Sequence, residues 1–285
     1  MIVPAYRSQD TICACLEALG RQDEHIEVIV VDSSPDNCSE TLVRERFPAV
    51  RYFHHPARLL PHEARNWGAE RAQGQVLVFT DPDCVAQPDW MMRLLARHAA
   101  GPAVVGGAIR SLPGWWNRAV QATKFGWWLP ESPAGPRSEV PSGNCSFPRE
   151  VWRAVQGFRG EYFGGDSEIC WRVRAAGYPI WFEPGAVVTH LEHPSFKPFA
   201  HERFQRGRDF GRMRVRVQAW GRVRCLVYLL GSPILPWIMA ARSARYATEG
   251  RYVASWLSTF PVQLLGFSLW CLGEARAHGE TLWQH

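Results

Sequence analysis

Short apolar runs alternate with helix-like patterns from the start of the chain to about residue 110. Five runs have the length and composition of buried strands, at 2–6, 26–31, 50–53, 75–80 and 103–109. Segments with helical periodicity lie between them, at 11–19, 40–47, 62–73 and 89–99. This alternation predicts an α/β fold whose mostly parallel sheet is flanked by helices.

The pattern changes over residues 111–195. Residues 111–141 hold four tryptophans and five prolines, so we expect a loop-rich region there. Strands and helices then resume, with strands at 143–147, 178–182 and 186–190 and helices at 149–155 and 167–176. We therefore predict one domain over 1–195, made of the halves 1–110 and 111–195.

A third pattern begins after residue 195. Residues 201–224 contain eight arginines but only two acidic residues, and two uncharged stretches follow at 225–241 and 252–273. As helices these stretches would measure about 26 Å and about 33 Å, against a bilayer core of about 30 Å. We predict a basic amphipathic linker at 196–224 and a membrane-associated helical region at 225–285.

Two arrangements of this tail at a membrane are open. A double crossing would place the arginines around Arg245 outside, against the positive-inside tendency, so we favour a crossing by 252–273 alone. The stretch 225–241, which Pro233 and Pro236 interrupt, would then be re-entrant or interfacial.

The basic stretch fits a helix on anionic headgroups. Its expected apolar anchors are Phe204, Phe210 and Trp220. The alternative is a solvated basic helix packed on the preceding α/β domain. We expect no nucleic-acid partner, because the basic stretch runs directly into apolar segments of lipid length.

Composition excludes several classes of protein. Hydrophobic residues make up 46% and charged residues 21% of the 285, which is typical of a folded chain. Arginine supplies all but two of the 32 basic residues, and neither Lys124 nor Lys197 follows a glycine, so a P-loop is absent. The eight cysteines form no C-x-x-C pair, and we expect reduced thiols. Met1 leads into Ile2 without a signal-peptide pattern, so we expect a cytoplasmic domain.

The segment Asp81-Pro82-Asp83 is the strongest local signal for chemistry. Two carboxylates at i and i+2 follow a buried strand and share a face in extended chain. At the carboxyl edge of a parallel sheet they could hold Mg²⁺ or Mn²⁺ together with a diphosphate, and a plain turn is the alternative.

Four other polar residues stand at the ends of predicted elements. Asp32 closes a strand from which an acid can bind a ribose or base, although the glycines of a dinucleotide-binding turn are missing after the first strand. Arg65 lies early in a helix and could reach phosphate. Asp166 is either a helix N-cap or a general base, and His190 is either a packed residue or a metal ligand.

Taken together, these pieces resemble the family 2 inverting glycosyltransferases of GT-A fold. The resemblance covers 1–195 and rests on six motifs in the family's order: Ile2-Val3-Pro4-Ala5-Tyr6, Val30-Val31-Asp32, Ala64-Arg65-Asn66-x-Gly68, Thr80-Asp81-Pro82-Asp83, Ser142-Gly143-Asn144 and Gly165-Asp166-x-Glu168-x-x-Trp171-Arg172. It implies a GT-A domain with a nucleotide-binding half at 1–110 and an acceptor half at 111–195.

The resemblance also implies roles for individual residues. Pro4, Ala5, Tyr6, Asp32, Arg65 and Asp81 would hold a nucleotide-sugar donor, usually a uridine diphosphate sugar. Asp83 and His190 would bind a divalent cation, Mn²⁺ or Mg²⁺, and Asp166 would be the general base. Gly143, Asn144 and Trp171 would lie on the acceptor side. The expected acceptor is a hydroxyl of a lipid-linked or cell-envelope glycan, at the cytoplasmic face of the membrane.

The sequence departs from the family at three points. The first strand starts at Ile2, closer to the chain start than is usual, and Gly165 replaces the glutamate that usually precedes the base. The processive Q-x-x-R-W motif is missing, because Gln205 is followed by Arg206-Gly207-Arg208-Asp209, so we expect a single transfer per encounter. A catalytically silent membrane scaffold and a nucleotidyltransferase are the alternative functions.

Overall fold

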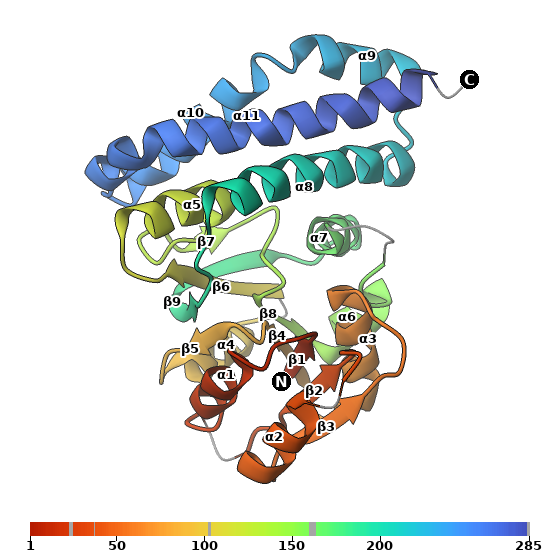
Figure 1. Cartoon of the computed structure of the whole chain (residues 1–285), viewed down its shortest axis with the longest axis vertical. Helices are drawn as coiled ribbons and strands as arrows, with labels where there is room; N and C mark the ends of the chain where they lie inside the picture. Colours follow the sequence, from red (N-terminus) through yellow and green to blue (C-terminus); the bar gives the residue numbers. More distant parts are fainter. Residues whose placement is uncertain (23–24, 37, 102–103, 160–163, 284–285) are drawn as a thin grey trace. The chain divides into compact units, whose positions relative to one another are not determined.

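The computed structural model describes residues 1–22, 25–36, 38–101, 104–159 and 164–283 (Figure 1). The chain forms two compact units. The sheet unit comprises Met1–Arg110, Ala134–Arg159 and Asp166–Glu192. The helical unit comprises Ser111–Pro133, Gly160–Gly165 and His193–His285.

A mixed sheet is the centre of the sheet unit. Its described strands are β1 (Ile2–Ala5), β2 (Ile29–Asp32), β3 (Arg51–His54), β4 (Val76–Thr80), β5 (Cys84–Ala86), β6 (Val104–Ser111), β7 (Gly135–Pro136), β8 (Asn144–Pro148) and β9 (Ile180–His190). They lie in the order β3-β2-β1-β4-β8-β6-β9-β5, with β7 paired to β9. The α/β sheet flanked by helices that the sequence predicts is thereby confirmed.

The direction of the strands creates a switch point beside β1. Strands β1, β2 and β3 are parallel, and β4 joins the other edge of β1 in the same direction. Strand β8 then pairs antiparallel to β4, from Val76 opposite Pro148 to Thr80 opposite Asn144. Ligands of open α/β sheets bind where the strand order reverses, outside the carboxyl ends of the strands. Here that place is next to the ends of β1 and β4.

The described residues of this unit form the helices α1 (Ile12–Leu19), α2 (Cys38–Arg46), α3 (Pro61–Arg71), α4 (Trp90–Ala99), α6 (Arg149–Val155) and α7 (Gly165–Ala175). Helix α3 shows how local sequence sets such an element. Pro61 provides a preset backbone at the first position, and Glu63 Oε2 accepts the Leu60 N–H at 2.6 Å. Gly68 lets α3 approach β1, because a Cβ there would lie 2.6 Å from Ile2 Cγ2.

Some elements differ from the sequence-based expectation. The runs 178–182 and 186–190 form one strand, β9, and the short strands β5 and β7 were not predicted. Both short strands pair with β9, and segments this short become strands only through such pairing. The region expected to be loop-rich contains helix α5, Trp115–Phe125.

The helical unit consists of α5 together with α8 (Phe196–Val217), α9 (Arg222–Gly231), α10 (Leu235–Glu249) and α11 (Val253–Trp283). Helix α11 packs against the other four, and Figure 1 shows it between α8 and α9. Its contact with α5 places Ser111–Pro133 in this unit, whereas the sequence division had grouped that segment with the sheet. Trp115 Nε1 donates to Ser258 O at 3.0 Å across this contact.

Helices α8 and α11 cross at very short range. A Cβ on Gly207 would lie 2.1 Å from Trp270 O, and one on Gly273 would lie 2.1 Å from Phe204 O. Glycine is therefore required on both helices for the backbones to touch, as in other closely packed helix pairs.

The arginine-rich helix α8 turns many of its charges toward α11. Arg208 and Arg212 bind Glu280 at 2.6 and 2.9 Å, and Arg214 lies 3.6 Å from Glu274. Burial would raise the pKa of Glu280, but hydrogen bonds from its arginine partners lower that pKa to about 2. These pairs hold α8 inside the unit.

The predicted lipid anchors of this segment are accordingly wrong in part. Trp220 is buried and stacks on the His278 ring at 5.3 Å between centroids, and Phe210 packs on Trp270 at 5.4 Å. Trp220 therefore does not face outward as the sequence suggested, whereas Phe210 is half-buried and keeps part of its surface exposed.

A membrane span by α11 alone is not supported either. Among the helices that the structure describes, no single one is both long and apolar enough to cross a bilayer. The pair α9 and α10, bent by 73°, meets the length and hydropathy requirements only when its helices are taken together. The length and hydropathy of α11 thus give no support to the prediction that 252–273 crosses by itself. Polar Gln263 and Glu274, which are buried against neighbouring helices, interrupt that stretch and the helix around it.

Candidate active site

Two carboxylates stand at the carboxyl end of β4, beside the switch point of the sheet. Asp81 and Asp83 flank Pro82 in a turn that the Cys84 N–H closes by donating to Asp81 O at 3.0 Å. Both side chains are half-buried, with 31% and 35% of their surface exposed. The segment Asp81-Pro82-Asp83 is therefore a turn, and it also presents two partly exposed carboxylates.

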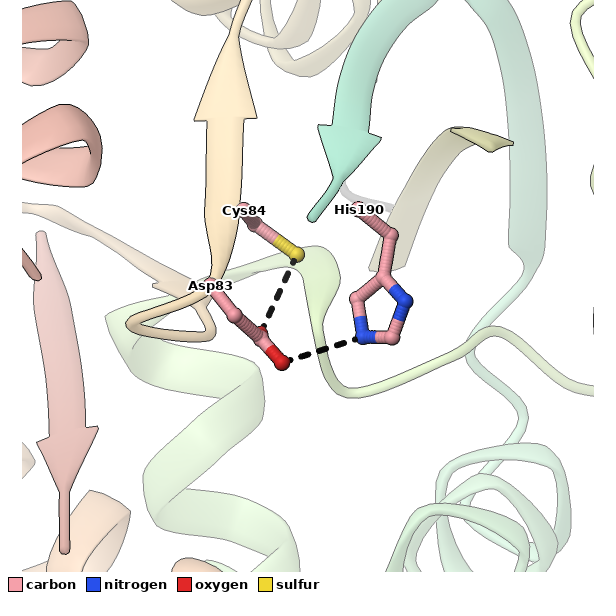
Figure 2. A group of neighbouring side chains, drawn as sticks. All are labelled: Asp83, Cys84 and His190. Carbon is pink, nitrogen blue, oxygen red and sulfur yellow. Dashed lines mark hydrogen bonds and ion pairs between the residues drawn. The ribbon is translucent and has the colours of Figure 1, made fainter. Parts of the chain in front are cut away.

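Asp83 lies close to His190 from the end of strand β9 (Figure 2). Strands β5 and β9 pair with Cys84 opposite His190, and the Leu191 N–H donates to Asp83 O at 2.8 Å. This register brings His190 Nε2 to 3.3 Å from Asp83 Oδ2. The structure therefore brings together the two metal ligands that the resemblance implied.

The donor set around Asp83 suits a hard divalent cation. Asp83, Cys84 and His190 offer ligand atoms within 4.8 Å of one another. Burial, and then the charges of Asp81 and Asp83, raise the pKa of the Cys84 thiol well above its ordinary value. A soft sulfur ligand suits neither Mn²⁺ nor Mg²⁺, so the carboxylate oxygen of Asp83 and the imidazole nitrogen of His190 are the ligands that fit such a cation.

Glu192 was not singled out from the sequence. Its Oε2 lies 3.5 Å from His190 Nδ1, on the side of the ring away from Asp83. A carboxylate in this position fixes the ring so that Nε2 stays directed at Asp83. The i and i+2 spacing of His190 and Glu192 was the available signal, since such residues share a strand face.

Arg65 and Gly143 both contact the Asp81 carboxylate. Arg65, from α3, donates from Nη2 to Asp81 Oδ1, and its side chain is only 5% exposed. Its Nε is buried with no hydrogen-bond partner among the described residues. On the other side, a Cβ on Gly143 would come within 2.5 Å of Asp81 Oδ2. Arg65 thus orients Asp81 and, within the described part of the chain, retains an unpaired Nε–H. Because Gly143 has no side chain, the Asp81 carboxylate can occupy the space beside it.

Asp32 is fully buried at the end of β2. Its Oδ1 accepts the Ser34 N–H at 2.7 Å and the Ser34 hydroxyl at 2.5 Å, and its Oδ2 accepts the Tyr52 hydroxyl at 2.8 Å. Burial raises the pKa of Tyr52, and the hydrogen bond to Asp32 raises it further. Asp32 therefore holds the β2 loop in place. Tyr52, which carries no motif, was missed by the sequence analysis.

The turn after β1 presents an aromatic ring. Pro4 and Ala5 are buried in the strand, whereas Tyr6 is half-buried and the Arg58 guanidinium lies 4.5 Å from its ring centre. The Arg7 N–H donates to Ser34 Oγ at 2.7 Å, so this turn is tied to the loop that Asp32 orders. The ends of β1 and β2 thus form one wall beside the switch point.

Asp166 lies in the first turn of α7, and its Oδ1 accepts the Ser167 N–H at 3.0 Å. Burial raises the pKa of the Cys145 thiol, Arg65 lowers it, and Asp166 and Asp81 raise it further. These three charged groups therefore lie within electrostatic range of the same sulfur. Asp166 and Asp81, which are far apart in the sequence, thus both influence the pKa of the Cys145 thiol.

Two of the predicted acceptor-side residues are held by internal hydrogen bonds. Trp171 Nε1 donates to Glu139 Oε1 at 3.1 Å, and its ring remains half-buried. Asn144 is fully buried: Oδ1 accepts from Trp90 Nε1 at 2.9 Å, and Nδ2 donates to Ala108 O and Ala186 O. The prediction that Asn144 faces an acceptor is corrected, because its polar atoms join β8 to α4, β6 and β9.

The family of the chain follows from a comparison with protein-family models. The model described as Glycosyl transferase family 2 matches residues 1–148, which include β1, Asp32, Arg65, the acidic pair and Gly143. The chain belongs to glycosyl transferase family 2. A family 2 glycosyltransferase is a transferase enzyme, and the resemblance inferred from the motifs is confirmed.

Relatives of this glycosyltransferase include named glycosyltransferases and a succinoglycan biosynthesis protein. Glycosyltransferase AglE of Haloferax volcanii is 24% identical over 77% of this chain and 73% of its own length. Succinoglycan biosynthesis protein ExoO of Rhizobium meliloti is 33% identical over 36% of this chain. The pre-mycofactocin glycosyltransferase of Mycobacterium tuberculosis is 30% identical over 50% of it. This chain spans only 30% and 32% of the last two relatives.

Solved structures show the same fold. The mannosyltransferase PcManGT from Pyrobaculum calidifontis, in complex with GDP-Man and Mn²⁺, aligns with a TM-score of 0.60 over 92% of this chain and 86% of its own, at 20% identity. GalNAc-T7 with UDP, GalNAc and Mn²⁺ aligns with a TM-score of 0.55 over 66% of this chain and 43% of its own, at 16% identity. The glycosyltransferase therefore has the GT-A fold of enzymes that bind nucleotide sugars.

Proposed function

We propose that this glycosyltransferase moves a sugar from a uridine diphosphate sugar to a hydroxyl group, with inversion at the anomeric carbon. The observation that carries the proposal is the meeting of Asp83 with His190 beside the Arg65–Asp81 pair, at the switch point of the sheet. Nucleotides bind at such switch points, and a diphosphate needs cationic partners there.

The donor would lie along the ends of β1, β2 and β4. The wall of Pro4, Ala5 and Tyr6 is tied to the loop that Asp32 orders, so Asp32 shapes the nucleoside site. Asp81 would accept from the ribose hydroxyls, since Arg65 holds its carboxylate in one orientation. The Nε–H of Arg65, which has no hydrogen-bond partner among the described residues, would donate to a diphosphate oxygen.

A divalent cation, Mn²⁺ or Mg²⁺, would be held by Asp83 and His190. When bound, it would neutralise the negative charge that develops on the departing diphosphate. The protein's part is to fix the two ligands: the β5–β9 register sets their separation, and Glu192 sets the direction of the imidazole.

Asp166 would act as the general base of the transfer. Its carboxylate takes the proton of the acceptor hydroxyl, the hydroxyl oxygen bonds to the anomeric carbon, and the bond from that carbon to the diphosphate oxygen breaks with its electron pair. A single displacement of this kind inverts the anomeric configuration. The proposal is supported by the place of Asp166 in the first turn of α7, within electrostatic range of the sulfur that Asp81 also influences.

The acceptor would be a glycan or a lipid-linked hydroxyl of the cell envelope, extended by one sugar per encounter. The half-buried ring of Trp171 is the acceptor-side candidate that the structure leaves with exposed surface. We place the protein at the cytoplasmic face of the membrane, attached through its C-terminal helices, and without a nucleic-acid partner.

Isothermal titration with uridine diphosphate and Mn²⁺ tests the donor and the cation together. We expect binding that requires the metal and that EDTA abolishes, and weaker binding of guanosine diphosphate. The guanosine control matters because the neighbours differ: one complex contains UDP and the other GDP-Man. Loss of all nucleotide binding would favour a silent scaffold, and transfer of a nucleotidyl group to a sugar phosphate would favour a nucleotidyltransferase.

Replacing Gly143 by alanine should weaken donor binding. The added Cβ would stand 2.5 Å from Asp81 Oδ2, so the carboxylate must move and Arg65 with it. A displacement of this size should lower donor affinity by about ten- to hundredfold, measured as the dissociation constant of UDP with Mn²⁺. Gly74→Ala is the matched control, because the nearest atom to its Cβ is 3.5 Å away. Equal affinities for the two variants would contradict the role of Asp81.

A further inference from the structure

Helices α9 and α10 expose an apolar face to solvent. Val223, Leu226, Val227 and Leu230 on α9 are 46% to 78% exposed, and Ile234, Trp237 and Ile238 follow at 47% to 62%. The spacing of each set is i, i+3, i+4, with i+7 added on α9, which is one face of a helix. Contiguous exposed apolar surface of this kind marks an interaction site.

The opposite faces of the same two helices are apolar and buried. Cys225 on α9 and Pro236, Ala240 and Ala247 on α10 are buried in the helical unit, where both helices pack on α11. The exposed face is therefore not the side that the fold needs for its own core. It is available to a partner that is itself apolar.

Charge identifies that partner. The sequence carries no charged residue between Arg224 and Arg242, and arginines stand at both ends of this stretch. Arg222 and Arg224 flank Val223 at the start of the exposed face on α9, and Arg242 follows the face on α10; all three arginines are exposed. A charge-free apolar centre between two basic ends matches the hydrocarbon and the headgroup layer of an anionic bilayer.

Two backbone N–H groups at the corner between the helices have partners within the corner. The Ser232 N–H donates to Leu229 O at 3.3 Å, and the Ile234 N–H donates to Gly231 O at 2.9 Å. Ser232 Oγ also donates to Leu229 O, at 2.8 Å. Pro233 and Pro236 have no N–H to satisfy. This matters in hydrocarbon, where no water can pair an exposed backbone group.

Length decides how deep the corner can reach. Helix α9 has ten residues and is about 15 Å long, and the uncharged part of α10 is shorter. A whole hydrocarbon core is about 30 Å thick and one leaflet is about half of that. The helices also bend by 73° at the corner. Each arm fits one leaflet. If the first arm enters obliquely, at about half the bend angle to the membrane plane, the 73° bend directs the second arm back toward the side of entry.

We infer that the α9–α10 corner inserts into one leaflet of an anionic membrane as a re-entrant wedge, while α11 stays outside the hydrocarbon. The inference deepens the proposed membrane attachment, on which it rests, and it assigns the attachment to one element. Helix α11 is committed to α8, α5, α9 and α10, and it buries Gln263 and Glu274 there, so it is not free to span.

Vesicle sedimentation of the full chain tests the wedge. We expect binding to vesicles of phosphatidylcholine with phosphatidylglycerol. The variant Val227→Ser, Leu230→Ser, Ile234→Ser, Trp237→Ser should reduce the partition coefficient about a hundredfold or more, because four side chains that are 58% to 72% exposed lose their lipid contact. Because these side chains point to solvent, the variant should keep the helical content and the thermal midpoint of the parent.

A variant of α11 is the matched control, and it also tests the alternative that α11 binds the membrane. Leu257→Ser, Leu272→Ser removes side chains that are 59% and 57% exposed, and it should leave binding unchanged. Equal binding by the wedge variant and the wild type, or loss of binding in the α11 variant alone, would overturn the inference. Arg222→Gln, Arg242→Gln should weaken binding about fivefold per arginine on anionic vesicles only.

Fusions at His285 separate a wedge from a span. Both arms of a wedge return to one side, so a C-terminal alkaline phosphatase should be inactive and a C-terminal green fluorescent protein should fluoresce. An active phosphatase would overturn the wedge. Failure of the wild type to bind any of the vesicles would refute the membrane attachment itself. Metal-dependent UDP binding, measured on the same sample, would then show that the sugar-transfer proposal still stands. A dimer that the wedge variant abolishes would assign the face to a second copy instead.

Discussion

Replacing Asp83 by alanine is expected to abolish metal-dependent nucleotide binding and to lower sugar transfer by at least about a hundredfold. The substitution removes the carboxylate that lies 3.3 Å from His190 Nε2 and leaves one imidazole, which holds a hard cation weakly. The measurement is the affinity for UDP with and without Mn²⁺, followed by initial rates of donor hydrolysis and transfer.

The fold should survive this change. Asp83 contributes its backbone carbonyl to the Leu191 N–H, and alanine keeps that bond. Asp89→Ala is a matched control, because Asp89 is a partly exposed acid of the same unit that pairs with Arg93. If the Asp83 variant retained metal-dependent binding while the control behaved like wild type, the metal assignment would be wrong. His190→Ala should show the same loss, to a lesser degree.

Replacing Asp166 by asparagine is expected to lower the transfer rate by about a hundred- to ten-thousandfold and to leave donor affinity nearly unchanged. Asparagine keeps an oxygen for the Ser167 N–H, so the first turn of α7 is preserved, but it cannot accept the proton of the acceptor hydroxyl. Rates at saturating donor, together with UDP titration on the same variant, separate the two effects.

Glu150→Gln provides the comparison for Asp166→Asn. Glu150 is an exposed acid in the first turn of α6, in the same unit, and its neutralisation should change neither quantity. The configuration of the product at the anomeric carbon, read by NMR, tests inversion directly. Transfer at the wild-type rate by the Asp166 variant, or retention of configuration, would refute the proposed base.

Much of the sheet unit was predictable because its signals are local. Apolar runs bounded by turn residues marked β1, β2, β3, β4 and β6, and helix α6 was predicted at its observed bounds. The short strands β5 and β7 gave no such signal, since three and two residues become strands only through pairing with β9. Helix α5 was missed because its tryptophans and the surrounding prolines suggested loops.

The sequence predicted which residues belong to the candidate site better than it predicted which of them contact one another. Asp81, Asp83, Asp166 and His190 were identified from their positions at element ends. The sequence around Arg65 did not indicate that Arg65 would pair with Asp81. The sequence around Asn144 did not indicate that its side chain would hydrogen-bond to β6 and β9. A side chain's partner depends on which elements the fold brings together, and that is a long-range property.

The helical unit shows the same limit most clearly. The sequence by itself determined that residues 201–224 are strongly basic and that 225–241 carries no charge, because composition is independent of the fold. Only the tertiary structure decided that the arginines of α8 face Glu280 and Glu274, and that the exposed apolar surface gathers on α9 and α10. Packing determines whether a charged side chain faces water or an opposite charge. Here the glycines of α8 and α11 allow the two backbones to touch, and this close approach brings the charged side chains of the two helices together.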